Sequence, residues 1–179
     1  MGEPKKRQEI ISWGKSVFIA FAIVVIVRTF VFAPYIVDGA SMEPTLHDQE
    51  KIFVNKVNTD NIEREAIVII KGEDENYVKR IIGLPGDTIE IRDDQLLING
   101  APHSEKYLEE NRELANEQGS VLTGDFGPIL VPKGHYFVLG DNRLRSMDSR
   151  NGLGFIKKEK IVGVSEFVFF PFSDVRTVQ

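Results

Sequence analysis

Ser41 and Lys79 are two residues whose types could together break a peptide bond. Ser41 lies in the run Gly39-Ala40-Ser41-Met42-Glu43-Pro44-Thr45-Leu46, and Lys79 lies in Tyr77-Val78-Lys79-Arg80-Ile81-Ile82-Gly83-Leu84-Pro85-Gly86-Asp87. A serine hydroxyl attacks a carbonyl when a neighbouring base takes its proton. A lysine can be that base if apolar surroundings lower its pKa and keep it neutral. The pair therefore indicates acyl-transfer chemistry.

Each of the two residues also has an explanation without catalysis. Ser41 follows small residues and precedes Pro44, a pattern typical of a turn in which the hydroxyl caps the chain. Lys79 stands among apolar residues, as a lysine of an edge strand does when its amine reaches out to solvent. Considered one at a time, the patterns favour these structural roles.

Histidine offers no better base for Ser41. His47, His103 and His135 each stand in a polar or turn-like stretch and are expected at the surface. No two of them have the spacing of ligands on one helix or hairpin, so no metal site is predicted. The chain has no cysteine, which excludes a thiol nucleophile and disulfides. We expect neither a metal nor a cofactor.

An apolar segment ahead of Ser41 has the length of a membrane span. Residues 17–33 are interrupted only by Arg28-Thr29. Residues 16–35 supply about the 20 positions that a helix needs to cross the hydrocarbon layer. Arg28, near the far end, is expected to extend to the outer headgroups. The basic residues ahead of the span place the N-terminus in the cytoplasm by the positive-inside tendency; they are Lys5, Lys6, Arg7 and Lys15.

A cleavable secretory signal is the alternative interpretation of this segment. Val31-Phe32-Ala33 has the form of a small-residue cleavage site. Pro34 would crowd the leaving nitrogen, and Arg28 interrupts the apolar stretch, so an uncleaved anchor is favoured. Pro34 is also expected to end the helix, because its ring disfavours helical geometry at Ala33. Eight residues then reach from Ala33 to Ser41, at most about 26 Å of extended chain, which keeps Ser41 near the outer membrane surface.

The rest of the sequence indicates a mostly β domain. Its composition, 42% apolar and 27% charged, is typical of a folded chain, and the net charge of -5 disfavours a nucleic-acid partner. Residues 106–118 are polar and are predicted to form a short exposed helix or a loop. Strands are expected at residues 51–57, 66–70, 77–84, 88–92, 95–98, 135–139 and 161–170.

Three segments, in order, resemble the boxes of type I signal peptidases. They are Ser41-Met42-Glu43-Pro44-Thr45-Leu46, then residues 77–87, then Gly140-Asp141-Asn142-Arg143 with Ser146-Met147-Asp148-Ser149-Arg150. These enzymes are membrane-bound serine endopeptidases that remove signal peptides from exported preproteins. Lys79 matches the bacterial Ser-Lys form, and the short chain with one anchor is similar to the enzymes of Gram-positive bacteria.

The resemblance implies an architecture. It implies one N-terminal transmembrane helix followed by a β-rich catalytic domain of coiled antiparallel sheets that rests on the membrane by an apolar surface. The phenylalanines within residues 167–172 can contribute to that surface, although a buried terminal strand explains them equally well. We predict a cytoplasmic tail at residues 1–15, a signal anchor at 16–35 and an extracytoplasmic catalytic domain at 36–179.

The same resemblance implies roles for particular residues. It makes Ser41 the nucleophile and Lys79 the general base, with Ser146 as the serine that hydrogen-bonds and orients the lysine. It also makes Asp148 and Arg150 a paired acid and base that hold the shape of the site. Asp141 belongs to the same box.

One position departs from the pattern of the family. In some members a serine two positions before the nucleophile donates its hydroxyl to the oxyanion, and here that position is Gly39. The oxyanion hole is therefore expected to rely on backbone N–H groups, including that of Ser41.

The resemblance implies cleavage after small residues through an acyl-enzyme. The expected partners are signal peptides of preproteins and membrane lipid, without nucleic acid. One alternative is an inactive relative, a membrane-anchored β domain that binds preproteins or scaffolds a complex. A self-cleaving repressor-type Ser-Lys peptidase is the other, but it would carry a DNA-binding N-terminus, which residues 17–33 are not.

Overall fold

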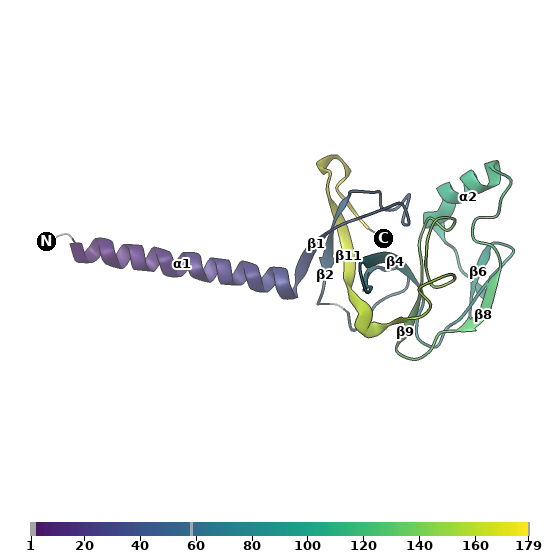
Figure 1. Ribbon diagram of the computed structural model, residues 1–179, viewed down its shortest axis with the longest axis horizontal. Coiled ribbons are helices and arrows are strands. Elements are labelled where there is room, and N and C mark those ends of the chain that lie inside the picture. The colour runs from purple at the N-terminus through teal and green to yellow at the C-terminus, as the bar shows by residue number, and fades with distance from the viewer. Residues whose placement is uncertain (1–2, 58, 179) are drawn as a thin grey trace.

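A long N-terminal helix leads into a β domain in the computed structural model, which describes residues 3–57 and 59–178 (Figure 1). Helix α1 spans Glu3–Phe30 and projects away from the β domain. Within the described part of the chain, no helix combines the length and the apolar character that crossing a membrane requires. Large apolar side chains of α1 are nevertheless exposed: Trp13, Val17, Phe18, Ile19, Phe21, Ile23, Val24 and Val25.

The expectation that Pro34 ends the helix is wrong. Helix α1 ends at Phe30, and the residues that follow form strand β1 (Phe32–Ile36), which pairs with β2 (Lys51–Asn55). Pro34 is tolerated because β1 lies at the edge of its sheet, where a missing N–H removes no essential ladder bond. Pairing with β2 also buries Ala33, so a contact with a distant segment replaces the local helical pattern.

The helix also begins before the predicted span. It starts at Glu3 rather than at residue 16, so most of the predicted tail is helical. The predicted orientation in a membrane depends on basic side chains that lie outside the described part of the structure, and it stays a prediction. They are Lys5, Lys6, Arg7 and Arg28.

Two antiparallel sheets make up the β domain, in agreement with the mostly β class predicted from the sequence and the antiparallel sheets implied by the resemblance. The larger has the strand order β1-β2-β11-β3-β4-β9-β10, with β12 paired to β11, and the smaller has the order β7-β6-β5-β8. The remaining strands are β3 (Ile67–Lys71), β4 (Asn76–Gly83), β5 (Thr88–Arg92), β6 (Gln95–Ile98), β7 (Ala101–Pro102), β8 (Phe126–Leu130), β9 (His135–Leu139), β10 (Ile156–Lys157), β11 (Ile161–Phe170) and β12 (Arg176–Thr177).

Strands with a clear apolar pattern were predicted closely. The predictions for β5, β6, β9 and β11 coincide with the structure, and those for β2, β3 and β4 differ by one or two residues at their ends. The sequence did not reveal β1, β7, β8, β10 or β12. These strands are only two residues long or contain a proline, so they present little alternation to detect.

The polar stretch at residues 106–118 is helical, one of the two predicted alternatives. A short 3-10 helix, η1 (Lys106–Leu108), leads into α2 (Glu109–Glu117). One side of the segment is not exposed, because Leu108 and Ala115 form a small separate core with Leu122.

Strand β3 lies between two apolar clusters, and β4 pairs with it. Ile67 and Ile69 face a cluster that includes Met42, while Val68 and Ile70 face a second cluster. Burial on both faces explains the unbroken apolar run of β3. Strand β4 pairs with β3 along residues 76–80 and lies in the interior of the larger sheet.

Candidate active site

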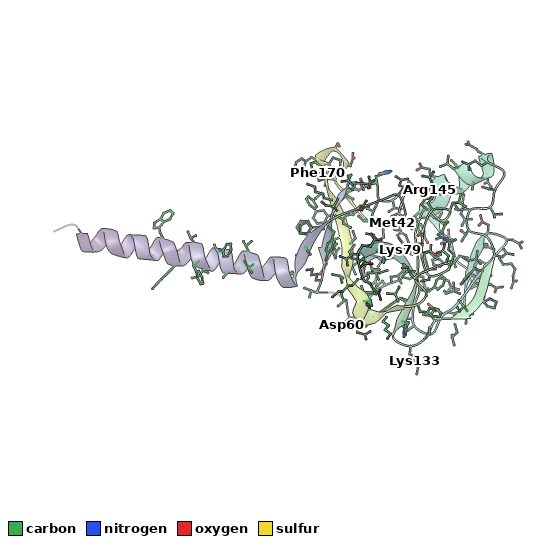
Figure 2. The ribbon with its side chains drawn as sticks, viewed as in Figure 1. Met42, Asp60, Lys79, Lys133, Arg145 and Phe170 are labelled. Carbon is green, nitrogen blue, oxygen red and sulfur yellow. The ribbon has the colours of Figure 1, made fainter. Side chains whose placement is uncertain are left out.

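Ser41 and Lys79 meet although 38 positions of sequence separate them. A hydrogen bond of 2.8 Å joins Lys79 Nζ to Ser41 Oγ, and the amine also donates to the carbonyl of Val78 at 2.9 Å. The Lys79 residue is only 3% exposed. The Lys79 amine therefore does not reach out to solvent, as it would in the alternative interpretation, but lies inside the domain (Figure 2).

Burial lowers the pKa of Lys79 from 10.5 to about 8. The loss of water around the amine is the largest cause, because the charged form is the one that water stabilises. The negative charges of Asp148, Asp141 and Glu75 oppose this effect in part. In the described part of the chain no carboxylate forms a hydrogen bond with the amine, so desolvation prevails.

Strand β4 has an open edge next to Lys79. On one side it pairs with β3 along residues 76–80. On the other side β9 pairs only from Arg80 onward, since the chain leaves the sheet after Leu139. Among the described strands, none covers residues 76–79 on that side, and an extended peptide can pair there.

Residues 39–46, here called the serine loop, are anchored in the domain core. Met42 and Leu46 are buried in the cluster under the larger sheet. Turn hydrogen bonds hold the loop: the N–H of Glu43 donates to Ala40 O, and that of Leu46 to Met42 O. The shape of the loop is therefore set by packing as well as by its own hydrogen bonds.

Asp141 forms a buried ion pair with Arg80, the residue after the lysine. Arg80 donates to both carboxylate oxygens, at 2.9 and 2.6 Å. Thr45 Oγ1 also donates to Asp141, at 2.6 Å, which ties the serine loop to the pair. Arg80 stacks over the ring of Tyr107 at 4.0 Å. The sequence assigned no role to Arg80, because an arginine among apolar strand residues carries no local signal of its partner.

The predicted pairing of Asp148 with Arg150 is present. Arg150 donates to both oxygens of Asp148, each at 2.9 Å. Asp148 also accepts a hydrogen bond from the N–H of Gly140, and Arg150 donates to the carbonyl of Arg143. These contacts close the loop of residues 140–150 on itself.

A second buried pair was missed from the sequence. Arg143 donates to Glu105, and both side chains are almost fully buried. Glu105 also accepts a hydrogen bond from the hydroxyl of Tyr107. The segment before α2 is thereby fastened to the loop of residues 140–150.

The expected hydrogen bond between Ser146 and Lys79 is not formed in the structure. Ser146 is buried, but within the described residues its hydroxyl has no hydrogen-bond partner. Ser146 nevertheless lies close to the serine loop. A Cβ atom added at Gly140 would overlap Ser146 Oγ and lie 2.5 Å from the carbonyl oxygen of Ser41. The absence of a side chain at Gly140 lets the two segments approach.

Gly39 adopts a backbone conformation that favours glycine, with φ of 82°. Its N–H donates to Asp48 Oδ1 at 2.8 Å. The N–H of Ser41 donates no hydrogen bond within the described residues. Of these two backbone donors, that of Ser41 is available to a bound carbonyl oxygen.

In the described part of the chain, none of the three histidines forms a hydrogen bond with Ser41 or Lys79. His47 is exposed, His103 Nε2 lies 2.7 Å from Glu65 Oε1, and His135 contacts the carbonyl of Lys133. His47 lies at the surface, as predicted, whereas His103 and His135 are half-buried. In residues 3–57 and 59–178, no group of histidine and acidic side chains has the arrangement of a metal site.

Known proteins share both the sequence and the fold. The family model for signal peptidase, peptidase S26, matches residues 10–170. A signal peptidase I of Bacillus amyloliquefaciens is 54% identical over 173 residues, which cover 96% of this chain and 94% of the relative. Signal peptidase I T of Bacillus subtilis (strain 168) is 54% identical over 176 residues, with 96% and 91% covered.

A solved structure agrees with these relatives. The crystal structure of a signal peptidase I from Enterococcus faecalis V583 is 40% identical and has a TM-score of 0.54, covering 59% of this chain and 97% of that one. The family model covers far more than half of the chain, and the relatives match it almost from end to end. The chain belongs to the signal peptidase family, peptidase S26.

Proposed function

We propose that this signal peptidase cuts signal peptides from exported preproteins with Ser41 as the nucleophile and Lys79 as the general base. The observation that carries the proposal is the 2.8 Å contact between Ser41 Oγ and the amine of a buried lysine. A lysine with a pKa of about 8 has a substantial neutral fraction at neutral to mildly alkaline pH. Such an amine can accept a proton, which an ordinary surface lysine cannot do under those conditions.

The preprotein binds in extended form along the open edge of β4. Backbone groups of residues 76–79 supply hydrogen bonds to the peptide, as in other cases of strand addition. Val37, Met42 and Val78 belong to the apolar cluster beside this edge. Small side chains before the cut are the ones that pack against this closely filled cluster.

Acylation begins when the neutral Lys79 takes the proton of Ser41 while Oγ attacks the substrate carbonyl carbon. The negative charge that develops on the carbonyl oxygen is stabilised by the N–H of Ser41. Lys79, now protonated, gives its proton to the leaving amine as the peptide bond breaks. The signal peptide remains attached to Ser41 as an ester.

Deacylation repeats the steps with water. Lys79, neutral again, takes a proton from a water molecule that attacks the ester. The ester bond breaks, Ser41 Oγ recovers a proton from Lys79, and the signal peptide leaves with a new carboxylate.

Four further residues hold this arrangement. Asp141 and the pair Asp148–Arg150 fix the loop beside the lysine by their buried hydrogen bonds. Ser146 orients the Lys79 amine during the reaction, since its unpaired hydroxyl can turn toward a group that changes its charge.

Helix α1 anchors the enzyme in the membrane through the helical part of the predicted anchor 16–35, which ends at Phe30, with residues 1–15 cytoplasmic and 36–179 outside. The exposed apolar side chains of α1 support this, since water solvates them poorly. Phe170 and Phe172 are 39% and 82% exposed, and Phe170 lies on the side of the domain toward α1 (Figure 2). They extend the contact to lipid. The acidic chain binds no nucleic acid.

The test is cleavage of one preprotein by the full chain in detergent. Ser41→Ala and Lys79→Ala should each abolish cleavage while circular dichroism shows an intact fold. Lys79→Arg should be inactive as well, because arginine keeps its proton at working pH. Substantial cleavage by Ser41→Ala or Lys79→Ala would overturn the assignment.

A further inference from the structure

A cavity of about 450 Å³ opens beside the serine loop. One wall is the serine loop itself, at Glu43 and Pro44, and a second wall is the start of the loop of residues 140–150, at Asn142 and Leu144. Helix α2 forms the third wall. We call this space the α2 cavity.

The α2 cavity begins close to the reacting hydroxyl. Glu43 is two residues from Ser41, so their Cα atoms are at most about 7 Å apart. On the other wall, the N–H of Asn142 donates to the carbonyl of Ser41 at 3.1 Å. An extended peptide advances about 3.3 Å per residue, so a chain held at Ser41 reaches the cavity within two or three residues.

The α2 cavity and the open edge of β4 border different parts of the serine loop. The open edge adjoins Lys79 and the apolar cluster that includes Val78. The residues that line the cavity include Arg145 but neither Lys79 nor Val78. If the residues before the cut follow β4, the residues after it leave toward the cavity.

The wall formed by α2 is fixed in place. The Asn111 side-chain amide donates to the carbonyl of Glu43 and to that of Asp141, each at 2.9 Å. These two bonds hold the helix against both loops that shape the active site. The cavity is therefore a built feature of the domain rather than a gap beside a loose helix.

The lining of the cavity combines apolar and charged side chains. Leu114 and Leu144 are 47% and 59% exposed and both line it. Glu43, Glu110 and Arg145 lie at the same cavity, so both signs of charge are present. Such a surface suits a peptide chain that places one apolar side chain between the two leucines.

We infer that the α2 cavity binds the preprotein residues that follow the cleaved bond, with Leu114 and Leu144 contacting the second or third of them. The inference rests on the proposed function, because it takes Ser41 as the attacking residue. By this inference, α2 affects the value of kcat/KM according to the residues that follow the cleavage site in the preprotein.

The test uses two peptides that are identical before the cut. The long peptide has leucine at the second and third positions after the bond, and the short one ends in an amide after the first position. For Leu144→Asn and Leu114→Asn, the ratio of kcat/KM for the long peptide to that for the short one should fall about tenfold, as expected for a lost apolar contact. Leu130→Asn is the matched control, since Leu130 is 62% exposed on β8 and outside the cavity.

A series of substrates tests the inference without relying on how well a variant folds, because its main measurement uses the wild-type chain. Replacing both leucines of the long peptide by glycine should lower kcat/KM about tenfold with the wild-type chain and much less with Leu144→Asn. Equal ratios in all variants, together with no effect of the glycines, would overturn the inference. Failure of the proposed function would show differently, as cleavage of both peptides by Ser41→Ala.

Discussion

The guanidinium of Arg80 and the carboxylate of Asp141 form two parallel hydrogen bonds, and neither side chain is exposed to solvent. Arg80 follows the lysine of the site on β4, and Asp141 follows the last residues of β9. Because Asp141 also accepts a hydrogen bond from Thr45, the pair joins three segments of chain at one point. It sets the distance between strand β4, which holds Lys79, and the serine loop.

Asp141→Asn should destabilise the protein by about 3 kcal/mol, because it leaves the Arg80 charge buried without its partner. The free energy of unfolding would be measured by denaturant titration in detergent. Asp74→Asn is the control, since Asp74 is exposed in the turn between β3 and β4, and it should change stability little. Equal effects of the two substitutions would contradict the role assigned to the pair.

Activity should rise as the pH increases through about 8. The desolvated amine of Lys79 has its pKa lowered to about 8, and only the neutral form accepts the proton of Ser41. A profile of kcat/KM against pH reports this ionisation in the free enzyme. A midpoint of the pH profile near 10 would mean that the Lys79 amine is solvated and not buried.

Lys79→Met should remove activity and yet stabilise the fold at neutral pH. Burial of the ammonium disfavours the folded state below pH 8, where Lys79 is charged in both states. This penalty disappears between about pH 8 and 10.5, because the folded state loses its proton first. The lowering of the pKa corresponds to about 3 kcal/mol, an upper bound for the gain at pH 7.

Unfolding of wild type and Lys79→Met would be compared at several pH values. The stability of the wild type should approach that of the variant as the pH rises toward 10.5. A constant difference between the two proteins across this range would refute the linkage.

Gly140→Ala should reduce kcat at least about a hundredfold. The added methyl group would overlap Ser146 and press on the carbonyl of Ser41, and a displacement of about 1 Å in a reacting group has an effect of this size. Gly14→Ala is a suitable control, because a Cβ atom at Gly14 meets nothing within 4 Å. Wild-type kinetics for Gly140→Ala would show that the close approach is unnecessary.

Ser146→Ala should lower kcat without lowering stability. The hydroxyl of Ser146 has no partner among the described residues, so its removal leaves no new unpaired group and can stabilise the fold by about 1 kcal/mol. Steady-state kinetics and denaturant titration of the same preparation separate the two effects. A less stable variant with unchanged kcat would assign Ser146 to the fold instead of to Lys79.

The sequence predicted the parts of this molecule that depend on local patterns. The strands β5, β6, β9 and β11 have apolar patterns bounded by turns, and the family boxes identified Ser41 and Lys79 as partners. The partners of Arg80 and Arg143 could not be predicted, since they lie 61 and 38 positions away and depend on how the strands assemble. The end of α1 was not predicted because it also depends on a contact between distant segments. The residues around Pro34 form strand β1 and pair with β2.

Strand β1, which follows α1 directly, fixes the distance between the end of the helix and the active site. Helix α1 ends at Phe30, and β1 begins two residues later in the same sheet as β4, the strand that contains Lys79. The linker between the end of α1 and the β domain is therefore too short to let the position of Ser41 vary much relative to the helix. If α1 is held in the membrane, the height of Ser41 above the lipid is set by the sheet. A preprotein is then selected by how far its cleavage site stands from the membrane, as well as by the side chains around it.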